Sequence, residues 1–259
     1  MQFMILTRRK LTVAFSCLLI GVISLIVASS TAGKVVETVN EPREIPIYYV
    51  DTGEKVCALS FDAAWGNEQT NTLLDILDRY GVKSTFFLVK QWVDKYPDDV
   101  KEIAARGHDV GNHSATHPHM ASLSAEQQQQ EVTSCNEAVE ALTGACPTLF
   151  RAPYGEYDDK LVRGLKERGM YCVQWNIDSL DWKNPSPDEM VSRIQSKLCP
   201  GSVILMHNGA ENTPQALPKI IEMIQNEGYT IVPISRLIPG GDYHTDHEGK
   251  MILNDTDSR

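Results

Sequence analysis

The feature that most constrains the fold of this chain is a regular alternation of two kinds of segment after residue 55. Short apolar runs rich in β-branched and aromatic residues alternate with amphipathic stretches of helical length. A sheet whose strands alternate with helices in this way is parallel, so the pattern predicts an α/β fold. Seven strands are one fewer than a complete eight-stranded barrel has. They are expected at residues 56–61, 84–89, 108–111, 148–151, 171–177, 202–206 and 229–233.

Local signals support the helices expected between these strands. Ser124 stands three residues before Gln127, and Ser186 stands three residues before Glu189, so both segments match the capping box that starts a helix. Helix ends are expected at the glycines in positions 81, 107, 144, 169 and 228. These signals place the helix boundaries between the predicted strands.

The region after the first strand reads as one domain, because neither an internal repeat nor a Pro- or Ser-rich linker interrupts it. We expect this domain over residues 55–238, after a linker with an initial strand at residues 34–54. The last residues, 239–259, are polar and lack periodicity, so we expect a polar tail there. Its two histidines, His244 and His247, are interpreted as solvated residues and not as ligands.

The first 33 residues have the pattern of an export segment. Residues 11–28 contain no charged residue and directly follow the basic triplet Arg8-Arg9-Lys10. This run is long enough to span a membrane as a helix and longer than the apolar part of a typical signal peptide. We therefore expect residues 1–33 to form a retained membrane anchor or, alternatively, a cleaved signal peptide. Both alternatives place the remaining chain outside the cytoplasm.

Charge and cysteine content exclude several other functions. The formal net charge is −10, and the only strongly basic cluster lies at the N-terminus, so we expect no nucleic-acid partner. No Cys-x-x-Cys pair is present, which argues against a zinc knuckle or a thioredoxin-like motif. Cys57 and Cys172 are expected to be buried thiols. Whether Cys135 and Cys146 form a disulfide stays open.

Side chains capable of catalysis follow five of the predicted strands, at the ends where α/β barrels place their active sites. His113 and His117 have the spacing that aligns two imidazoles on one side of a helical turn to bind a metal ion. His207 follows an apolar strand, where a titratable group more often marks a site than a core contact. We therefore expect one site that contains Asp62, His113, His117, Arg151, Asp178, Asp181 and His207.

Five motifs in a fixed order resemble those of the polysaccharide deacetylases of the NodB-homology type, the carbohydrate esterase family 4. The resemblance covers about residues 55–235 and implies a distorted (β/α)7 barrel as a single catalytic domain. A second segment, Phe61-Asp62-Ala-Ala-Trp65-Gly66, is similar to the sporulation-associated, membrane-anchored deacetylases of spore-forming bacteria. The five motifs are Ser60-Phe61-Asp62, His113-Ser-Ala-Thr-His117, Arg151-Ala-Pro153-Tyr154, Asp178-Ser-Leu-Asp181-Trp182 and Leu205-Met-His207.

The resemblance implies a role for each residue that activates water. A divalent metal ion, zinc in the first place with cobalt or another ion as alternatives, would be held by His113 and His117 and would acidify a bound water. Asp62 would be the general base. Arg151 would hold this base in place and keep it ionised through a bidentate ion pair.

The remaining roles concern the leaving group and the acetyl pocket. His207 would be the general acid that protonates the departing amine, and Asp181 would raise its pKa. The backbone N–H of Tyr154 would stabilise the oxyanion. Trp182 and Leu205 would line the pocket for the acetyl methyl group; plain core packing stays open as the alternative for Leu205.

One position departs from the family pattern. Most members have two consecutive aspartates after the first strand, the second of which is a metal ligand, whereas Asp62 is followed here by Ala63. Loss of a carboxylate lowers metal affinity, although the ion that remains is a stronger Lewis acid. Because Asp62, Arg151, Asp181 and His207 are all present, we expect an active or weakly active enzyme.

The sequence thus predicts an exported, membrane-anchored and monomeric hydrolase that removes N-acetyl groups from amino sugars of a cell-wall glycan, with peptidoglycan as the first candidate. Two alternatives stay open. One is a glycan-binding protein that has lost turnover together with the metal ligand at Ala63. The other is an amidase or O-acetyl esterase on the same fold, which would act on a small substrate and need no long groove.

Overall fold

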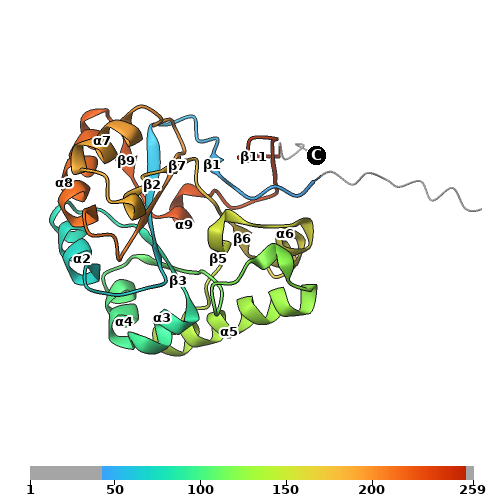
Figure 1. The fold of residues 1–259 in the computed structure, drawn as a ribbon. Helices are drawn as coiled ribbons and strands as arrows, with labels where there is room; N and C mark the ends of the chain where they lie inside the picture. Colours follow the sequence, from blue (N-terminus) through green and yellow to red (C-terminus); the bar gives the residue numbers. More distant parts are fainter. Residues whose placement is uncertain (1–42, 255–259) are drawn as a thin grey trace, which may run out of the picture. The chain divides into compact units, whose positions relative to one another are not determined.

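A curled sheet of parallel strands lies at the centre of the fold (Figure 1). The structure is a computed structural model, and it describes residues 43–254. The strands follow the order β6-β5-β4-β3-β2-β8-β7, and β9 pairs with β2 beside this path, always in parallel. The predicted α/β class and incomplete barrel are therefore confirmed. The strands are β2 (Val56–Ala63), β3 (Thr85–Leu88), β4 (Asp109–Asn112), β5 (Leu149–Phe150), β6 (Tyr171–Cys172), β7 (Ile177–Asp178), β8 (Val203–His207) and β9 (Thr230–Ile231).

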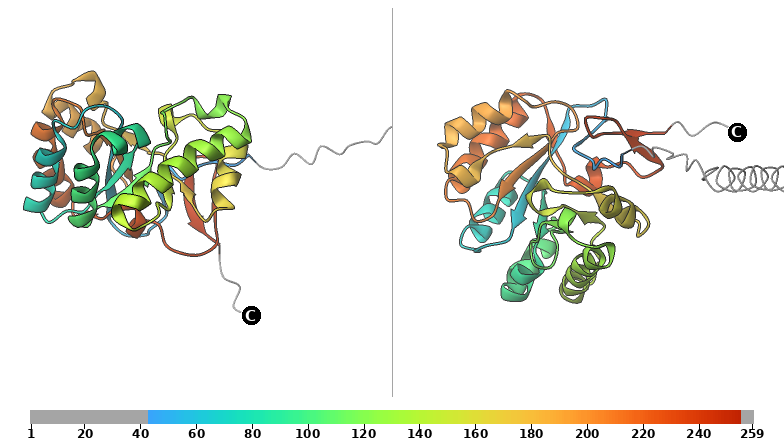
Figure 2. Two further views of the ribbon diagram at one scale, coloured as in Figure 1. Left: turned by 90° about the horizontal axis from the view of Figure 1, so that it is seen from below. Right: turned by 45° about the vertical axis from the view of Figure 1, so that its right-hand side comes forward.

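Helices surround the outer side of this sheet (Figure 2). Each long helix buries one apolar stripe; in α8, for example, Leu217, Ile220, Ile221 and Ile224 are fully buried. The stripes meet the outward-facing side chains of the strands, among which Phe61 and Phe86 stack with ring centroids 4.9 Å apart. The helices are α2 (Thr70–Arg79), α3 (Lys90–Lys95), α4 (Pro97–Ala105), α5 (Ala125–Thr143), α6 (Asp159–Lys166), α7 (Pro187–Gln195), α8 (Thr213–Asn226) and α9 (Ile234–Leu237).

Both predicted capping boxes are present. The Ser124 side chain accepts a hydrogen bond from the backbone N–H of Gln127 at the start of α5, and the Gln127 side chain accepts one from the Ser124 N–H. Ser186 and Glu189 make the same reciprocal pair at the start of α7. At the other end of α5, Gly144 adopts the left-handed conformation with φ 74°, which explains why a glycine stands there.

The single strand predicted over residues 171–177 is wrong, because the structure divides it into β6 and β7 at opposite ends of the sheet. The carbonyls of Val173 and Gln174 accept hydrogen bonds from the Arg151 guanidinium instead of a neighbouring strand. Asn176 then bonds through its side chain to Ser202 and Val203 at the start of β8. The apolar run therefore crosses the opening of the barrel instead of continuing one ladder.

A small second sheet closes the barrel at the end where the strands begin. It has the order β1-β11-β10, formed by β1 (Tyr49–Val50), β10 (Tyr243–Thr245) and β11 (Lys250–Leu253). Just before β1, Ile47 bonds through its backbone to Cys172 and Gln174, while the N–H of Val50 donates to the carbonyl of Gly201. The polar segment 239–259 therefore contains a hairpin, and Met251 within it is buried.

The described cysteines are all free thiols. Cys57 and Cys172 are buried, as expected. Cys135 is buried in α5 and donates to the carbonyl of Leu88, whereas Cys146 is exposed, so these two do not form a disulfide.

The apolar run at residues 11–28 lies outside the described residues. Within residues 43–254, no helix is both long and apolar enough to span a bilayer. The expected anchor or signal peptide thus stays a prediction.

Candidate active site

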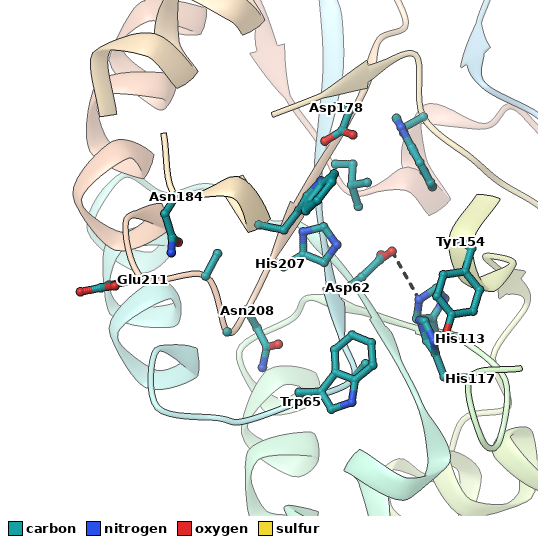
Figure 3. Close-up of a pocket in the computed structure, with 16 residues that line it drawn as sticks. Asp62, Trp65, His113, His117, Tyr154, Asp178, Asn184, His207, Asn208 and Glu211 are labelled. Carbon is teal, nitrogen blue, oxygen red and sulfur yellow. Dashed lines mark ion pairs between the residues drawn. The ribbon is translucent and has the colours of Figure 1, made fainter. Parts of the chain in front are cut away.

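A cleft of about 840 Å³ opens at the carboxyl ends of β2, β4 and β8 (Figure 3). Asp62, His113 and His207 reach it from these three strands or directly after them. Four aromatic rings line it as well, and three of them are more than half exposed: Trp65 at 69%, Tyr154 at 55% and Trp182 at 57%. Parallel strands end at one edge of a sheet, so residues far apart in sequence meet here, as the sequence predicts.

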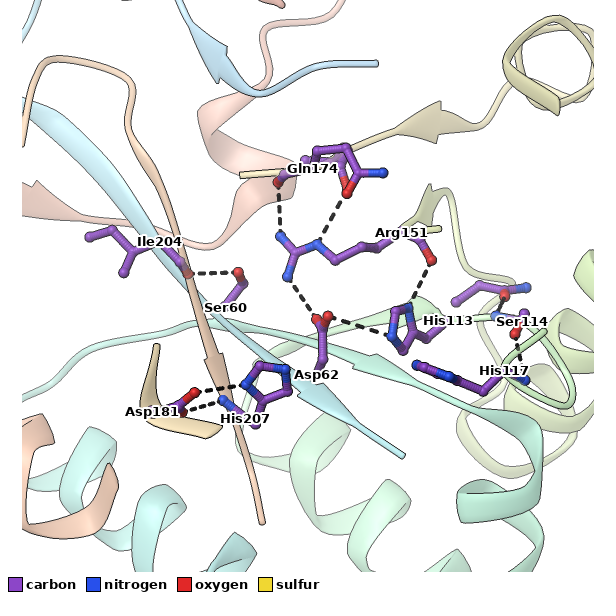
Figure 4. A network of polar contacts seen from close by, with 12 residues as sticks. Ser60, Asp62, His113, Ser114, His117, Arg151, Gln174, Asp181, Ile204 and His207 are labelled. Carbon is purple, nitrogen blue, oxygen red and sulfur yellow. Dashed lines mark hydrogen bonds and ion pairs between the residues drawn. The ribbon is translucent and has the colours of Figure 1, made fainter. Parts of the chain in front are cut away.

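Asp62 is the buried carboxylate at the centre of this cleft (Figure 4). Its Oδ1 lies 2.7 Å from Nη1 of Arg151, and its Oδ2 lies 3.5 Å from Nε2 of His113. Burial alone would raise the pKa of Asp62, but the charge of Arg151 and its hydrogen bond outweigh this effect and leave the pKa lowered. Asp62 is therefore ionised near neutral pH.

Arg151 is completely buried and holds Asp62 by a single guanidinium nitrogen. Its other nitrogens, Nε and Nη2, donate to the carbonyls of Val173 and Gln174. The ion pair with Asp62 is thus monodentate, which corrects the bidentate contact implied by the resemblance. The remaining donors of the guanidinium are used to fix the chain where it crosses from β6 to β7.

His113 and His117 do lie together, with ring centroids 4.9 Å apart. A loop, and not a helical turn, brings them there, because Ser114 and His117 have positive φ angles of 73° and 58°. The side chain of Asn112 accepts a hydrogen bond from the N–H of Ser114, and the Ser114 hydroxyl accepts one from the N–H of His117. These local bonds stabilise the strained backbone that turns both imidazoles toward the cleft.

The two imidazoles have nitrogens free to bind a metal ion. Nδ1 of His113 lies 2.8 Å from the carbonyl of Arg151 and must donate to it, so Nε2 carries the lone pair. Nδ1 of His117 is buried and has no hydrogen-bond partner among the described residues. Burial lowers the pKa of His113, and burial together with His113 lowers the pKa of His117 to about 4, so both rings are neutral near pH 7.

A third protein ligand is missing beside these nitrogens. Ala63, at the end of β2, is fully buried and offers only a methyl group. Residues 43–254 contain no group of three or more His, Cys, Asp or Glu side chains arranged to hold a metal ion. A catalytic zinc site has three protein ligands. The donors present therefore fit a divalent ion held by two nitrogens, with water at its other positions.

His207 and Asp181 form a second charged pair on the other side of Asp62. Nδ1 of His207 lies 2.7 Å from Oδ1 of the buried Asp181, whose Oδ2 accepts hydrogen bonds from the His207 N–H and the Thr213 hydroxyl. Burial opposes the charged imidazole, but the hydrogen bond and charge of Asp181 outweigh it and raise the pKa of His207. Because Nδ1 is engaged, Nε2 is the nitrogen left to transfer a proton.

The predicted pocket residues also reach the cleft. Leu205 lines the cleft and is buried, whereas the ring of Trp182 is exposed there, with the Lys183 ammonium 4.6 Å from the ring centroid. Tyr154 lies in the turn between β5 and α6 with φ 59°, and its ring contacts those of His117 and His119. Every site residue expected from the sequence thus lies in or directly beside the cleft.

The sequence analysis does not assign every lining residue to the site; Trp65, Asn184 and Glu211 are among those it leaves out. Trp65 contacts His117 edge-on, with centroids 4.9 Å apart. Its place two residues beyond the departure at Ala63 is the one sequence signal that could have found it. Asn184 and Glu211 lie in loops where neither residue type indicates that the side chain faces a cleft.

Comparisons with known proteins identify relatives of this chain. The family model for polysaccharide deacetylase matches residues 49–173. A peptidoglycan-N-acetylglucosamine deacetylase of Bacillus cereus is 34% identical over 68% of this chain and 66% of its own length. The peptidoglycan-N-acetylmuramic acid deacetylase PdaA of Bacillus subtilis is 31% identical over 80% of both chains. The match with the uncharacterized protein YlxY of Bacillus subtilis, also 34% identical over 74% of this chain, spans only 60% of that relative.

A solved structure adds a contrasting case. BA3943 from Bacillus anthracis, a pseudoenzyme of carbohydrate esterase family 4, superposes with a TM-score of 0.73 at 33% identity, over 80% of this chain and 70% of its own. A mutant of BA3943 with restored enzymatic activity superposes equally well, at 34% identity over 80% of this chain and 72% of its own. The fold is thus shared by active and inactive proteins.

Proposed function

This chain belongs to the polysaccharide deacetylase family, and we propose that it hydrolyses N-acetyl groups of amino sugars in a cell-wall glycan, with peptidoglycan as its substrate. The observation that carries the proposal is that one cleft holds a carboxyl group with a lowered pKa and an imidazole with a raised pKa. Asp62 is kept ionised by Arg151, and His207 is kept protonated by Asp181. A base and an acid that face one cleft are what amide hydrolysis requires.

The reaction divides between these two groups. Asp62 removes a proton from a water molecule while the water oxygen bonds to the acetyl carbon. The carbon–nitrogen bond then breaks, and Nε2 of His207 gives its proton to the amine nitrogen. Acetate and a free amino sugar leave, and the proton on Asp62 passes back to the imidazole through solvent. Each transfer of this kind typically contributes about a hundredfold to ten-thousandfold in rate.

The oxyanion that forms between these steps needs its own stabilisation. We assign this role to the backbone N–H of Tyr154, in the turn that lines the cleft beside His117. A divalent ion, zinc or another, held by His113 and His117 would supply further positive charge at the acetyl oxygen when bound. Leu205 and Trp182 would contact the acetyl methyl group and exclude water from it.

The aromatic rings of the cleft support a sugar chain as substrate. Sugar rings present apolar faces that pack on aromatic side chains, and Trp65 and Trp182 expose their rings on the walls of the cleft. A cleft of about 840 Å³ is at the large end of the range for small-molecule sites. This size favours an oligosaccharide over the small amide or ester of the second alternative.

A glycan-binding protein without turnover is the second candidate function. The observation that favours it is Ala63, which leaves the two imidazoles without a carboxylate partner for a metal ion. The similarity to the pseudoenzyme BA3943 points the same way. In this case the aromatic cleft would bind the glycan, and Asp62 and His207 would not catalyse a reaction.

Acetate release separates the two candidates. The full chain in detergent is incubated with peptidoglycan fragments and N-acetylglucosamine oligomers, with and without added zinc or cobalt, beside Asp62→Asn and His207→Gln. We expect release from the wild type and a loss of at least about a hundredfold in either variant. Asp98→Asn, which changes an almost fully exposed carboxylate on α4, is the control for charge. Glycan binding without release by the folded wild type would establish the second candidate instead.

The place of action is part of the proposal. We propose that residues 11–28 carry the chain out of the cytoplasm and hold it at the membrane, because they are uncharged and follow a basic triplet. Membrane fractionation and the mass of the mature N-terminus test this. An intact N-terminus in the membrane fraction is expected; a shortened chain in the medium would show cleavage.

A further inference from the structure

We propose that Glu131 is a positioning residue, which holds the loop between His113 and His117 in the shape that binds a divalent metal ion. The inference rests on the proposed function, since this loop carries both imidazoles assigned to the ion. Glu131 lies in α5, and its carboxylate bonds to the loop between the two histidines. With only two protein ligands, the site depends strongly on how accurately the loop presents them.

Three hydrogen bonds join Glu131 to the loop. Its Oε2 accepts from the backbone N–H groups of Ala115 and Thr116, at 2.8 Å each. Its Oε1 accepts from the Thr116 hydroxyl at 2.9 Å. Hydrogen bonds to a charged acceptor are stronger than those between neutral groups, so these contacts fix the middle of the loop to α5.

Each backbone N–H of residues 113–117 has an acceptor. The first donates to the last carbonyl of β3, the second to the Asn112 side chain and the fifth to the Ser114 hydroxyl. The third and the fourth both donate to Glu131. Ala115 is buried, so removal of the carboxylate would leave its N–H without an acceptor unless the loop moved.

The His117 ring depends on this backbone more than the His113 ring does (Figure 4). Nδ1 of His113 donates to the carbonyl of Arg151, and this bond sets the orientation of the ring. Nδ1 of His117 has no partner among the described residues, so the loop backbone and the neighbouring rings place this imidazole. With φ 58°, His117 also has a strained backbone, which persists only where its surroundings hold it.

The helix that carries Glu131 is itself fixed to the sheet. The side chain of Asn112, at the end of β4, donates to the carbonyl of Val132 and to the side chain of Asn136, both in α5. Cys135 of the same helix donates to the last carbonyl of β3. Glu131 therefore holds the loop from a rigid support.

Zinc affinity, measured on the full chain in detergent by competition with a chromophoric chelator, tests the proposal. His117→Ala identifies the zinc bound at this site, because other histidines and cysteines of the chain could bind the ion elsewhere. We expect Glu131→Ala to weaken zinc binding at the site by about tenfold to a hundredfold, as loss of a residue that orients metal ligands does. Glu137→Ala, the same change at an exposed position of α5, should leave the affinity unchanged.

Glu131→Gln separates positioning from simple attraction between the carboxylate and the ion. Its amide oxygen can still accept from both N–H groups, and its amide nitrogen can donate to the Thr116 hydroxyl, but the charge is gone. We expect its zinc affinity to stay within about threefold of the wild type, because charges partly exposed to water attract weakly. A loss as large as that of Glu131→Ala would mean that the charge acts on the ion directly, and would overturn the positioning role.

Hydrogen–deuterium exchange of the metal-free protein gives a second readout. We expect the peptide that spans residues 113–117 to exchange at least about tenfold faster in Glu131→Ala than in the wild type, because two of its amides lose their acceptor. Glu131→Gln and Glu137→Ala should keep the slow exchange. If Glu131→Ala does not fold, Thr116→Val, which removes one of the three bonds at an exposed position, should weaken zinc binding to a smaller degree.

Two results would overturn the proposal. One is equal zinc affinity and equal exchange in the wild type and in the folded variants that lose bonds to the loop. The other is a wild type that binds no more zinc than His117→Ala does.

Acetate release separates this proposal from the proposed function. Weaker zinc binding by Glu131→Ala, together with no acetate release by the wild type, supports the positioning role and refutes the deacetylase. Acetate release that Glu131→Ala retains, at the zinc affinity of the wild type, supports the deacetylase and refutes the positioning role.

Discussion

At the scale of single residues, the chemistry depends on two charged pairs tuned in opposite directions. Arg151 lowers the pKa of Asp62, and Asp181 raises the pKa of His207, although burial works against the charged form in both cases. One cleft therefore holds an ionised base and a protonated acid at the same pH. This combination makes the pH dependence of the protein predictable.

We predict that Asp181→Asn moves the alkaline limb of the activity profile to lower pH. In the wild type, activity that needs protonated His207 is present below its raised pKa and is lost as the pH rises through it. Removal of the Asp181 charge lowers that pKa, because the hydrogen bond and charge of Asp181 are the largest contributions that raise it. The measurement is kcat/KM against pH, with a titration of the His207 ring by NMR if turnover is low. If the alkaline limb of Asp181→Asn stays at the wild-type pH, Asp181 does not set the pKa of His207 as assigned here.

The family pattern has a metal ligand where this chain has Ala63, so we predict that Ala63→Asp raises the affinity for zinc by at least about tenfold. A carboxylate there would give the ion a third protein ligand and offset its charge. Calorimetric titration of the metal alone measures the change without reference to activity. Ala105→Asp, which adds the same charge at an exposed position at the end of α4 and away from the cleft, is the control. Equal affinities of wild type and Ala63→Asp would show that position 63 does not face the ion.

The sequence predicts the catalytic residues but not all of the cleft wall. Asp62, Arg151 and His207 could be found because each follows a strand and strand ends meet at one edge. The direction of loop side chains depends instead on unusual backbone angles. Leu180 and Asn184, for example, have φ angles of 58° and 53°. Neither residue is a glycine, so the sequence does not indicate the left-handed conformation at these positions. Trp65 and Glu211 also lie outside helices and strands, so no periodicity indicates which way their side chains point.

At the scale of elements, the cap at the start of a helix was easier to predict than the path of a strand. A capping box is local, since it involves residues three apart. The break between β6 and β7 depends on Arg151, more than twenty residues earlier, which takes over the carbonyls of Val173 and Gln174. No local signal in an apolar run can indicate such a distant partner.

We predict that Ser186→Ala lowers the free energy of unfolding by about 1 kcal/mol, because it removes the acceptor for the Glu189 N–H at the start of α7. Ser192→Ala is the control in the same helix, since Ser192 is exposed in its interior and alanine is a good helix former there. Urea unfolding of both variants gives the comparison. Equal losses in the two variants would mean that the cap does not act as described.

At the scale of the whole molecule, the second sheet joins parts of the chain about 200 residues apart. β1 pairs with β11 in the register Tyr49 with Lys250 and Val50 with Met251. Composition did not reveal this pairing, because the hairpin has only three or four residues in each strand and is surrounded by polar residues. Met251 of the hairpin is buried in the core, and the partly buried Tyr243 packs against the same cluster.

We predict that Met251→Ala destabilises the protein by about 2–4 kcal/mol, because it leaves a cavity where β11 meets the core. Leu253→Ala, in the same strand but at a partly exposed position, should cost less than about 0.5 kcal/mol. Thermal unfolding of both variants measures the difference. A small effect of Met251→Ala would show that the hairpin adds little to the stability of the barrel.

The pairing of β1 with β11 also determines how the molecule can be handled. Both ends of the described chain run into this sheet, which contacts the barrel at Gly201 and Ser202, before β8 begins. The cleft lies at the other end of β8, at His207. An affinity tag or a bead attached at either end of the described chain therefore leaves the cleft accessible, so immobilised protein can be used to capture glycans.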